Sequence, residues 1–244
     1  MGNKFLNEEV LAFFAILSVL LLFFLYYYSV KRKFLLNLLL RSKNQFASIE
    51  SLEFLSGKVT GILFTGIIPF VLFVLIIKLL PLRIGLTFGR LPQFWYLVFA
   101  LVTVTALLSF YTSKSSKIFD HSPELRTRFW YPRHLLLSVS GWLFYIFGYE
   151  LFFRGILWFL CYDAFGFWSA LLINLLLYSL VHFPKGKLMT IGSIPLGVIF
   201  CLLSYATGSF FPAFLIHATM AILTEIFSMY HNPEFQFRIS KSGR

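Results

Sequence analysis

The chain has 244 residues, of which 59% are hydrophobic, 20% aromatic and only 13% charged, and its mean hydropathy is +0.81. A soluble domain carries about 25% charged residues because water must solvate its surface. This composition therefore excludes a soluble globule and indicates a multi-pass protein of the lipid bilayer. The net charge of +11 fits basic residues that flank apolar segments and face anionic headgroups, so we expect no nucleic-acid partner.

The first apolar segment, at about residues 10–30, predicts a retained transmembrane helix. Acidic residues precede it and Lys31, Arg32 and Lys33 follow it, whereas a cleaved secretory signal carries its positive charge in front. The next stretch, residues 34–58, is basic and amphipathic. It predicts a helix lying along the membrane interface and not a span.

Six further apolar segments follow in the sequence, at about residues 59–80, 94–111, 134–160, 167–182, 189–205 and 209–229. We therefore predict an all-α transmembrane bundle of about seven spans, or eight helices with the interfacial one. The most polar interior stretch, residues 112–133, reads as a solvated linker. We divide the chain into an N-terminal transmembrane portion (1–133), a site-bearing core (134–230) and a cytoplasmic tail (231–244).

The basic residues predict the orientation. If the N-terminus lies outside, sixteen of the 21 Lys and Arg residues fall on the cytoplasmic side, four fall outside, and Arg154 lies within a span. Cytoplasmic loops carry such an excess of positive charge. We expect a C-terminus in the cytoplasm and, in a bacterium, a plasma-membrane location.

Few ionisable side chains fall inside the apolar segments. An ionisable side chain costs roughly 2.5–3.5 kcal/mol or more at the centre of a membrane helix, so each one is a candidate for function. All of them belong to the C-terminal half, and they are Glu150, Arg154, His182, His217 and Glu225. Cys161 and Cys201 lie in apolar runs and are expected to be small packing residues.

Glu150 and Arg154 stand four residues apart and share one helix face, so they are expected to pair. An ion pair that only orients two helices is the alternative for these two residues. Together with His182 and His217, the carboxylate supplies the groups that water-activated peptide hydrolysis needs. The two histidines could also bind a divalent metal such as zinc, although no His-Glu-x-x-His spacing points to one.

Two features of this arrangement stay open. Counted from the helix ends, Glu150 and His217 fall near mid-span, whereas His182 ends its helix at the cytoplasmic side. A shared site therefore requires tilted helices or a loop that reaches inward. Glu225 follows His217 by eight residues, so it either lines the same cavity or lies solvated at the helix end.

Residues 141–228 resemble the CPBP family of intramembrane proteases, also called the ABI family, which includes Rce1-like CAAX prenyl proteases and bacteriocin-processing proteases. The family shows Glu-Glu-x-x-x-Arg, aromatic-x-x-x-His and His-x-x-x-Asn helices in this order. This chain has the corresponding stretches Tyr149-Glu150-Leu151-Phe152-Phe153-Arg154, Tyr178-Ser179-Leu180-Val181-His182 and His217-Ala218-Thr219-Met220-Ala221. Tyr149 replaces the first glutamate, and Ala221 replaces the asparagine.

The resemblance implies an intramembrane endopeptidase that hydrolyses a membrane-associated peptide or protein, with catalytic roles for Glu150, Arg154, His182 and His217. Tyr149 and Ala221 keep a second interpretation open, a family member that has lost hydrolysis and binds or escorts a membrane partner. A transporter or proton relay is a third interpretation. It is less favoured because the sequence has no internal repeat of the kind many transporters show.

Overall fold

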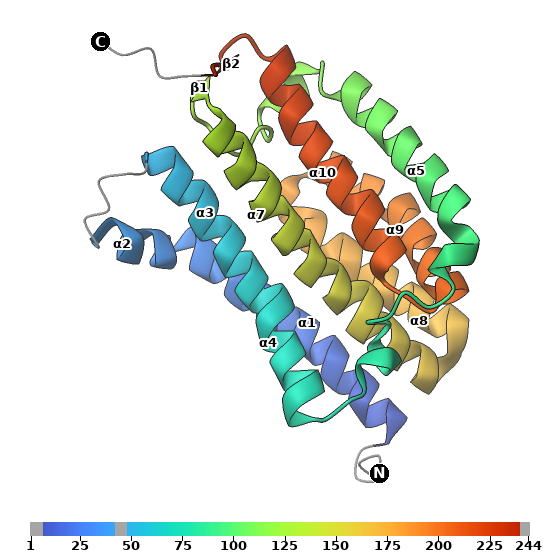
Figure 1. Cartoon of the computed structure of the whole chain (residues 1–244). Coiled ribbons are helices and arrows are strands. Elements are labelled where there is room, and N and C mark those ends of the chain that lie inside the picture. The colour runs from blue at the N-terminus through green and yellow to red at the C-terminus, as the bar shows by residue number, and fades with distance from the viewer. Residues whose placement is uncertain (1–6, 42–47, 240–244) are drawn as a thin grey trace.

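The computed structural model describes residues 7–41 and 48–239. Within them, six helices are long and apolar enough to cross a membrane, which confirms the all-α transmembrane bundle (Figure 1). Their bounds are Glu8–Lys31 (α1), Ile49–Ile76, Leu91–Thr112 (α5), Pro132–His182, Lys187–Thr207 (α9) and Phe211–His231 (α10). Lys4, Lys43, Lys241 and Arg244, which contribute to the basic-residue bias, lie outside the described residues.

The second long helix begins earlier than the sequence predicts. The interfacial stretch is confined to α2 (Phe34–Arg41), and the spanning helix starts at Ile49 and not near residue 59. It comprises α3 (Ile49–Ile62), η1 (Leu63–Ile67), α4 (Ile68–Phe70) and η2 (Val71–Ile76). The helix continues through Lys58 because this ammonium is buried against the ring of Trp142 and paired with Glu124.

The fourth long helix folds back on itself. At 51 residues a straight helix would extend about 76 Å, more than twice the bilayer core. Gly166 interrupts it with φ +74° and ψ 179°, a left-handed backbone conformation that favours glycine. The side-chain amide of Asn174 reaches the carbonyl of Phe153 at 2.8 Å, although 21 residues of straight helix would separate them by about 31 Å. The helix is therefore a hairpin of two arms, so the six long helices provide seven helical segments, the number of spans that the sequence predicts.

The two arms of this hairpin carry the candidate residues. The arm before Gly166 contains α7 (Pro132–Glu150), the π-helix η4 (Leu151–Leu157) and the first part of α8 (Trp158–His182). The arm after Gly166 is the rest of α8. Helices α1, α3 and α5 of the N-terminal portion pack against α8, α7 and α10 respectively. The N-terminal helices α1, α3 and α5 therefore pack against the helices that follow them in the chain.

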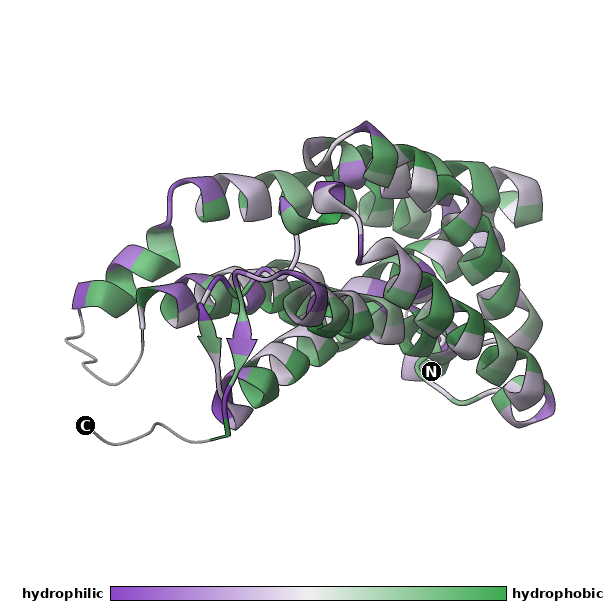
Figure 2. Ribbon diagram, turned by 90° about the horizontal axis from the view of Figure 1, so that it is seen from above, coloured by the Kyte–Doolittle hydropathy of each residue, from purple (hydrophilic) through white to green (hydrophobic). Residues whose placement is uncertain are grey.

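The remaining elements are short. They are the 3-10 turns η3 (Pro81–Ile84) and η5 (Phe183–Lys185), helix α6 (Ser116–Phe119), and a parallel pair of two-residue strands, β1 (Phe129–Trp130) and β2 (Gln236–Phe237). The described ends of the chain lie at opposite ends of the bundle (Figure 1). Figure 2 shows hydrophobic residues along the long helices and hydrophilic ones in the turns and near β1 and β2.

Two glycines bring the second spanning helix against α7. A Cβ atom on Gly148 would come within 2.8 Å of the Cα atom of Gly66, and the reverse distance is 3.0 Å. Small residues allow membrane helices to approach backbone to backbone. This contact fixes the position of the two residues that follow Gly148, Tyr149 and Glu150.

Candidate functional site

Glu150 lies at the centre of a buried charge cluster that we call the Glu150 cluster, consisting of Glu150, Arg154 and His217. Oε1 of Glu150 lies 2.5 Å from Nδ1 of His217 on α10, and Oε2 lies 3.2 Å from Nη1 of Arg154. Glu150 and Arg154 are fully buried, and 10% of the His217 side chain is exposed. The predicted pairing of Glu150 with Arg154 is confirmed.

The helix that carries this pair is π-type from Leu151 onward. Single π-turns are rare and occur often at functional sites. All seven residues of η4 are buried, and the carbonyl of Phe153 accepts the hydrogen bond from Asn174. Asn174 was not singled out from the sequence, although a lone amide in an apolar span is costly enough to mark it.

The hairpin brings His182 to the depth of Glu150. Tyr149 and His182 stand nearly the same number of residues before and after Gly166, and their ring centroids are 6.2 Å apart. Tyr149 also contacts His217 at 5.7 Å. The hairpin therefore answers the open question of depth: the arm after Gly166 ends at the level of Tyr149, so His182 reaches the cluster.

The hydrogen bonds of the two histidines fix where their protons lie. A carbonyl oxygen only accepts, so the 2.7 Å contact between Nδ1 of His182 and the carbonyl of Tyr178 places the proton on Nδ1. The carboxylate of Glu150 does the same for His217. In the neutral form of each ring, Nε2 then carries the lone pair.

Arg154 is enclosed by aromatic rings. Its guanidinium carbon lies 3.8 Å from the ring centroid of Tyr178 and 5.1 Å from that of Phe200. A cation above an aromatic face is attracted by the ring quadrupole. Tyr178 is fully buried and forms part of this surrounding. Gly197 also lies beside the guanidinium: a Cβ there would be at contact distance from Nη2, 3.4 Å, and would come within 2.8 Å of the side chain of Leu175.

Glu225 belongs to a different cluster, and the structure supports neither of its two interpretations. Its carboxylate accepts hydrogen bonds from the backbone N–H groups of Glu124 at 2.8 Å and Leu125 at 3.1 Å. Lys58 in turn donates to the carboxylate of Glu124 at 2.5 Å. Glu225 is buried, so neither the cavity beside His217 nor a solvated helix end describes it. It fastens the 112–133 linker to α10.

The donor groups do not converge in the way that a metal site requires. Within the described residues, no three His, Cys, Asp or Glu side chains come together as a possible ligand set. Glu150 and His217 bond to each other, and His182 bonds through Nδ1 to the backbone. Cys161 and Cys201 are buried free thiols, as predicted. We therefore derive no step through a metal.

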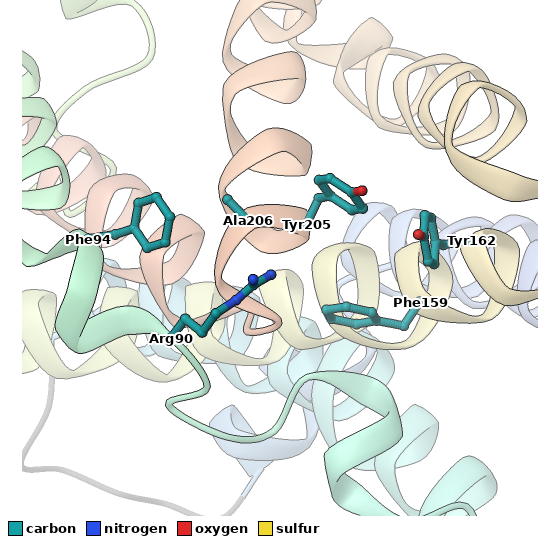
Figure 3. Close-up of a pocket in the computed structure, with 6 residues that line it drawn as sticks. All are labelled: Arg90, Phe94, Phe159, Tyr162, Tyr205 and Ala206. Atoms are coloured by element: carbon teal, nitrogen blue, oxygen red, sulfur yellow. The ribbon is translucent and has the colours of Figure 1, made fainter.

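Two surface pockets lie away from this cluster. One is lined by Arg90, Phe94, Phe159, Tyr162, Tyr205 and Ala206 (Figure 3), and the other by Arg126, Arg128, Glu234 and Phe235. Neither pocket includes a residue of the Glu150 cluster. The cluster itself is closed by the rings of Tyr149, Tyr178 and Phe200.

Comparison with known proteins agrees with the motifs. Residues 131–223 match the family model described as type II CAAX prenyl endopeptidase Rce1-like, which includes every residue of the Glu150 cluster together with Tyr149 and His182. No curated protein and no solved structure matches the chain. The expected resemblance is thus confirmed over residues 131–223, where the chain is similar to the Rce1-like family of CAAX prenyl endopeptidases, and we call these residues the Rce1-like segment.

Proposed function

We propose that the protein is an intramembrane endopeptidase that hydrolyses a membrane-associated peptide or protein. The observation that carries this proposal is the 2.5 Å contact between Glu150 and His217, within a fully buried environment. A carboxylate that holds the Nδ1 proton of a histidine makes Nε2 of the same ring a stronger and better oriented base. The Rce1-like segment, from a family of endopeptidases, supports the same chemistry.

In this proposal His217, and not Glu150, is the general base. Both carboxylate oxygens of Glu150 already face partners, His217 and Arg154. Nε2 of His217 removes a proton from water while the water oxygen attacks the peptide carbonyl carbon. Glu150 stabilises the imidazolium that forms, and Arg154 holds Glu150 in place. His182 acts as an imidazolium, because its Nδ1–H is held by the carbonyl of Tyr178; its Nε2–H stabilises the oxyanion or is given to the amine as the carbon–nitrogen bond breaks.

The substrate would enter from the membrane or from its cytoplasmic face, because His182 ends its arm of the hairpin where the chain turns. The basic residues predict that the side of the bundle towards which this arm ends faces the cytoplasm. A cysteine introduced at Ser116 in a Cys161- and Cys201-free background tests the orientation. It should react with an impermeant thiol reagent only after the membrane is opened.

A second function rests on Tyr149. This ring lies against both imidazoles, only 4% of the residue is exposed, and it stands where the family carries its first glutamate. A protein in which this ring keeps water from the histidines would bind or escort a membrane partner without cleaving it. Ala221, in place of the asparagine, favours the same function.

Purified protein in liposomes with a membrane-associated peptide substrate separates the two functions. For the protease, Glu150→Gln, His182→Ala and His217→Ala should each abolish cleavage. Double variants should be scarcely worse than single ones, since residues that act as a unit are not additive. His121→Ala, in the exposed part of the linker, is the matched control and should cleave as the wild type does.

Three outcomes would correct this proposal. Wild-type protein that binds the peptide without cutting it, while Tyr149→Glu creates cleavage, establishes the binding function. Equal cleavage by wild type and a folded Glu150→Gln variant refutes the mechanism. Inhibition by a chelator, reversed by added zinc, would show that the histidines hold a metal during the reaction.

A further inference from the structure

The pocket at the other end of the bundle contains a cation among aromatic rings. Its volume is about 550 Å³, within the roughly 300–1,000 Å³ of small-molecule sites. The guanidinium of Arg90 reaches towards the space between Tyr205 and Phe159, and the hydroxyls of Tyr162 and Tyr205 turn towards each other (Figure 3). The centroids of these two tyrosine rings are 5.5 Å apart. Three polar side-chain ends therefore line one pocket together with the apolar side chains of Phe94, Phe159 and Ala206.

The backbone holds Arg90 in this position. Its N–H donates to the carbonyl of Thr207 at 2.7 Å, which joins the start of α5 to the end of α9. Gly89 has φ +48°, and a Cβ on it would overlap the same carbonyl, so the close approach requires glycine. Phe88 stacks on Phe211 with ring centroids 4.8 Å apart. Arg90 thus projects from an anchored loop.

Arg90 has no carboxylate partner within the described part of the chain. The neighbouring cation, Arg83, contacts both Glu8 and Asp163. By contrast, no carboxylate of residues 7–41 and 48–239 forms an ion pair with Arg90. Because the local carboxylates are occupied by Arg83, the pocket keeps a net positive charge.

Exposed aromatic residues indicate the depth of the pocket. At this end of the bundle Trp95 is 64% exposed, Tyr96 61% and Trp168 79%. Exposed Trp and Tyr gather at the level of the lipid headgroups, where lipid phosphates lie. An arginine fork with tyrosine hydroxyls matches a phosphate, since the guanidinium donates two parallel hydrogen bonds to its oxygens. Phe94 and Phe159 offer apolar surface to the carbon chain attached to it.

We propose that this pocket binds the phosphate group of a phospholipid, with Arg90 as the main ligand and Tyr162 and Tyr205 as hydrogen-bond donors. The site joins α5, α8 and α9, so a bound lipid would hold the hairpin turn against its neighbours. The proposal does not depend on whether the protein cleaves peptides.

Native mass spectrometry of the detergent-purified protein tests the proposal. Titration with dioleoyl phosphatidylglycerol should give a saturable one-lipid complex, whereas dioleoylglycerol, which lacks the phosphate, should not bind. Arg90→Gln should weaken phosphatidylglycerol binding at least about tenfold, and Tyr162→Phe with Tyr205→Phe several-fold. Lys78→Gln, an exposed cation of the preceding loop outside the pocket, is the matched control and should bind as the wild type does.

Inorganic phosphate distinguishes the two sources of the ligand. If millimolar phosphate displaces the lipid, the pocket recognises the phosphate alone; if it does not, the lipid as a whole is required, and both results support a phosphate site. Thermal unfolding without lipid shows whether Arg90→Gln is folded. Equal lipid binding by wild type and folded Arg90→Gln, or equal losses in Arg90→Gln and Lys78→Gln, would overturn the proposal.

Discussion

Two clusters of charged side chains involve residues of the spanning helices, and they differ in what their polar atoms bind. In the Lys58 cluster, which we define as Lys58, Glu124 and Glu225, the buried carboxylate accepts two backbone N–H groups of the linker. In the Glu150 cluster the side chains bind one another. Nε of Arg154 and the hydroxyl of the adjacent Tyr149 have no hydrogen-bond partner among the described residues.

This difference indicates that the Lys58 cluster holds the structure together, whereas the Glu150 cluster is a candidate functional site. Buried polar groups are almost always hydrogen-bonded, so remaining capacity in a buried cluster calls for a functional explanation. The Lys58 cluster has its buried carboxylate satisfied by the backbone it holds. In the Glu150 cluster, donors remain without a hydrogen-bond partner among the described residues, as expected where water or a peptide group must be bound. Variants in the two clusters should therefore behave differently.

Arg154→Ala should have the largest effect on stability. It leaves the fully buried Glu150 with His217 as its remaining hydrogen-bond partner, and breaking a buried pair by removing one side costs about 3–5 kcal/mol. Thermal unfolding in detergent and the yield of folded protein measure the loss. Lys58→Ala is the comparison and should cost clearly less, because 42% of its partner Glu124 is exposed. If Arg154→Ala kept the stability and activity of the wild type, the Glu150–Arg154 pair would have to be exposed to water and not buried.

Glu225→Gln should destabilise the protein by about 1.5–3 kcal/mol, the usual cost for hydrogen bonds to a charged group. The amide retains one oxygen acceptor and presents an N–H group to a backbone N–H. Limited proteolysis of the 112–133 linker should become faster, and residual cleavage of a membrane peptide should stay close to that of the wild type after correction for folded protein. A complete loss of activity in folded protein would place Glu225 in the site.

Gly148→Ala should cost about 1–3 kcal/mol, the range for overpacking a filled interior. Its Cβ would meet the backbone of Gly66, which has no side-chain rotamer that could relieve the contact. Thermal unfolding measures the stability, and a cleavage assay reports whether the displaced helix moves Glu150. The matched control is Gly192→Ala, where a Cβ meets nothing within 4 Å. Equal stabilities of the two variants would mean that these helices do not touch.

Cys201→Ser should have the smallest effect, under about 1 kcal/mol. The thiol of Cys201 lies 3.4 Å from the amide oxygen of Asn174, and a serine hydroxyl can donate to the same oxygen. Peptide cleavage should persist in this variant and in Cys161→Ser. Loss of cleavage in a folded Cys201→Ser protein would point to thiol chemistry.

Much of the architecture follows from composition and spacing. The crossings were predictable because the bilayer requires about 20 apolar residues per helix, and polar groups are costly enough there to mark candidates. The four-residue spacing predicted the pairing of Glu150 with Arg154, which survives in the π-helix at 3.2 Å. The resemblance to the family was recognisable because the polar motif residues stand out in an apolar background.

Tertiary structure decided which of these polar residues act together. The turn at Gly166 sets the depth of His182, and no local pattern states where a hairpin arm ends relative to a neighbouring helix. The partner of Glu225 comes from a backbone segment about 100 residues away, and backbone groups carry no signal in the sequence. Spacing along one helix is fixed by its pitch, whereas contacts between helices depend on packing against glycines such as Gly66 and Gly148. The sequence by itself therefore determined the candidates, and only the packed bundle joined Glu150, Arg154 and His217 and separated them from Glu225.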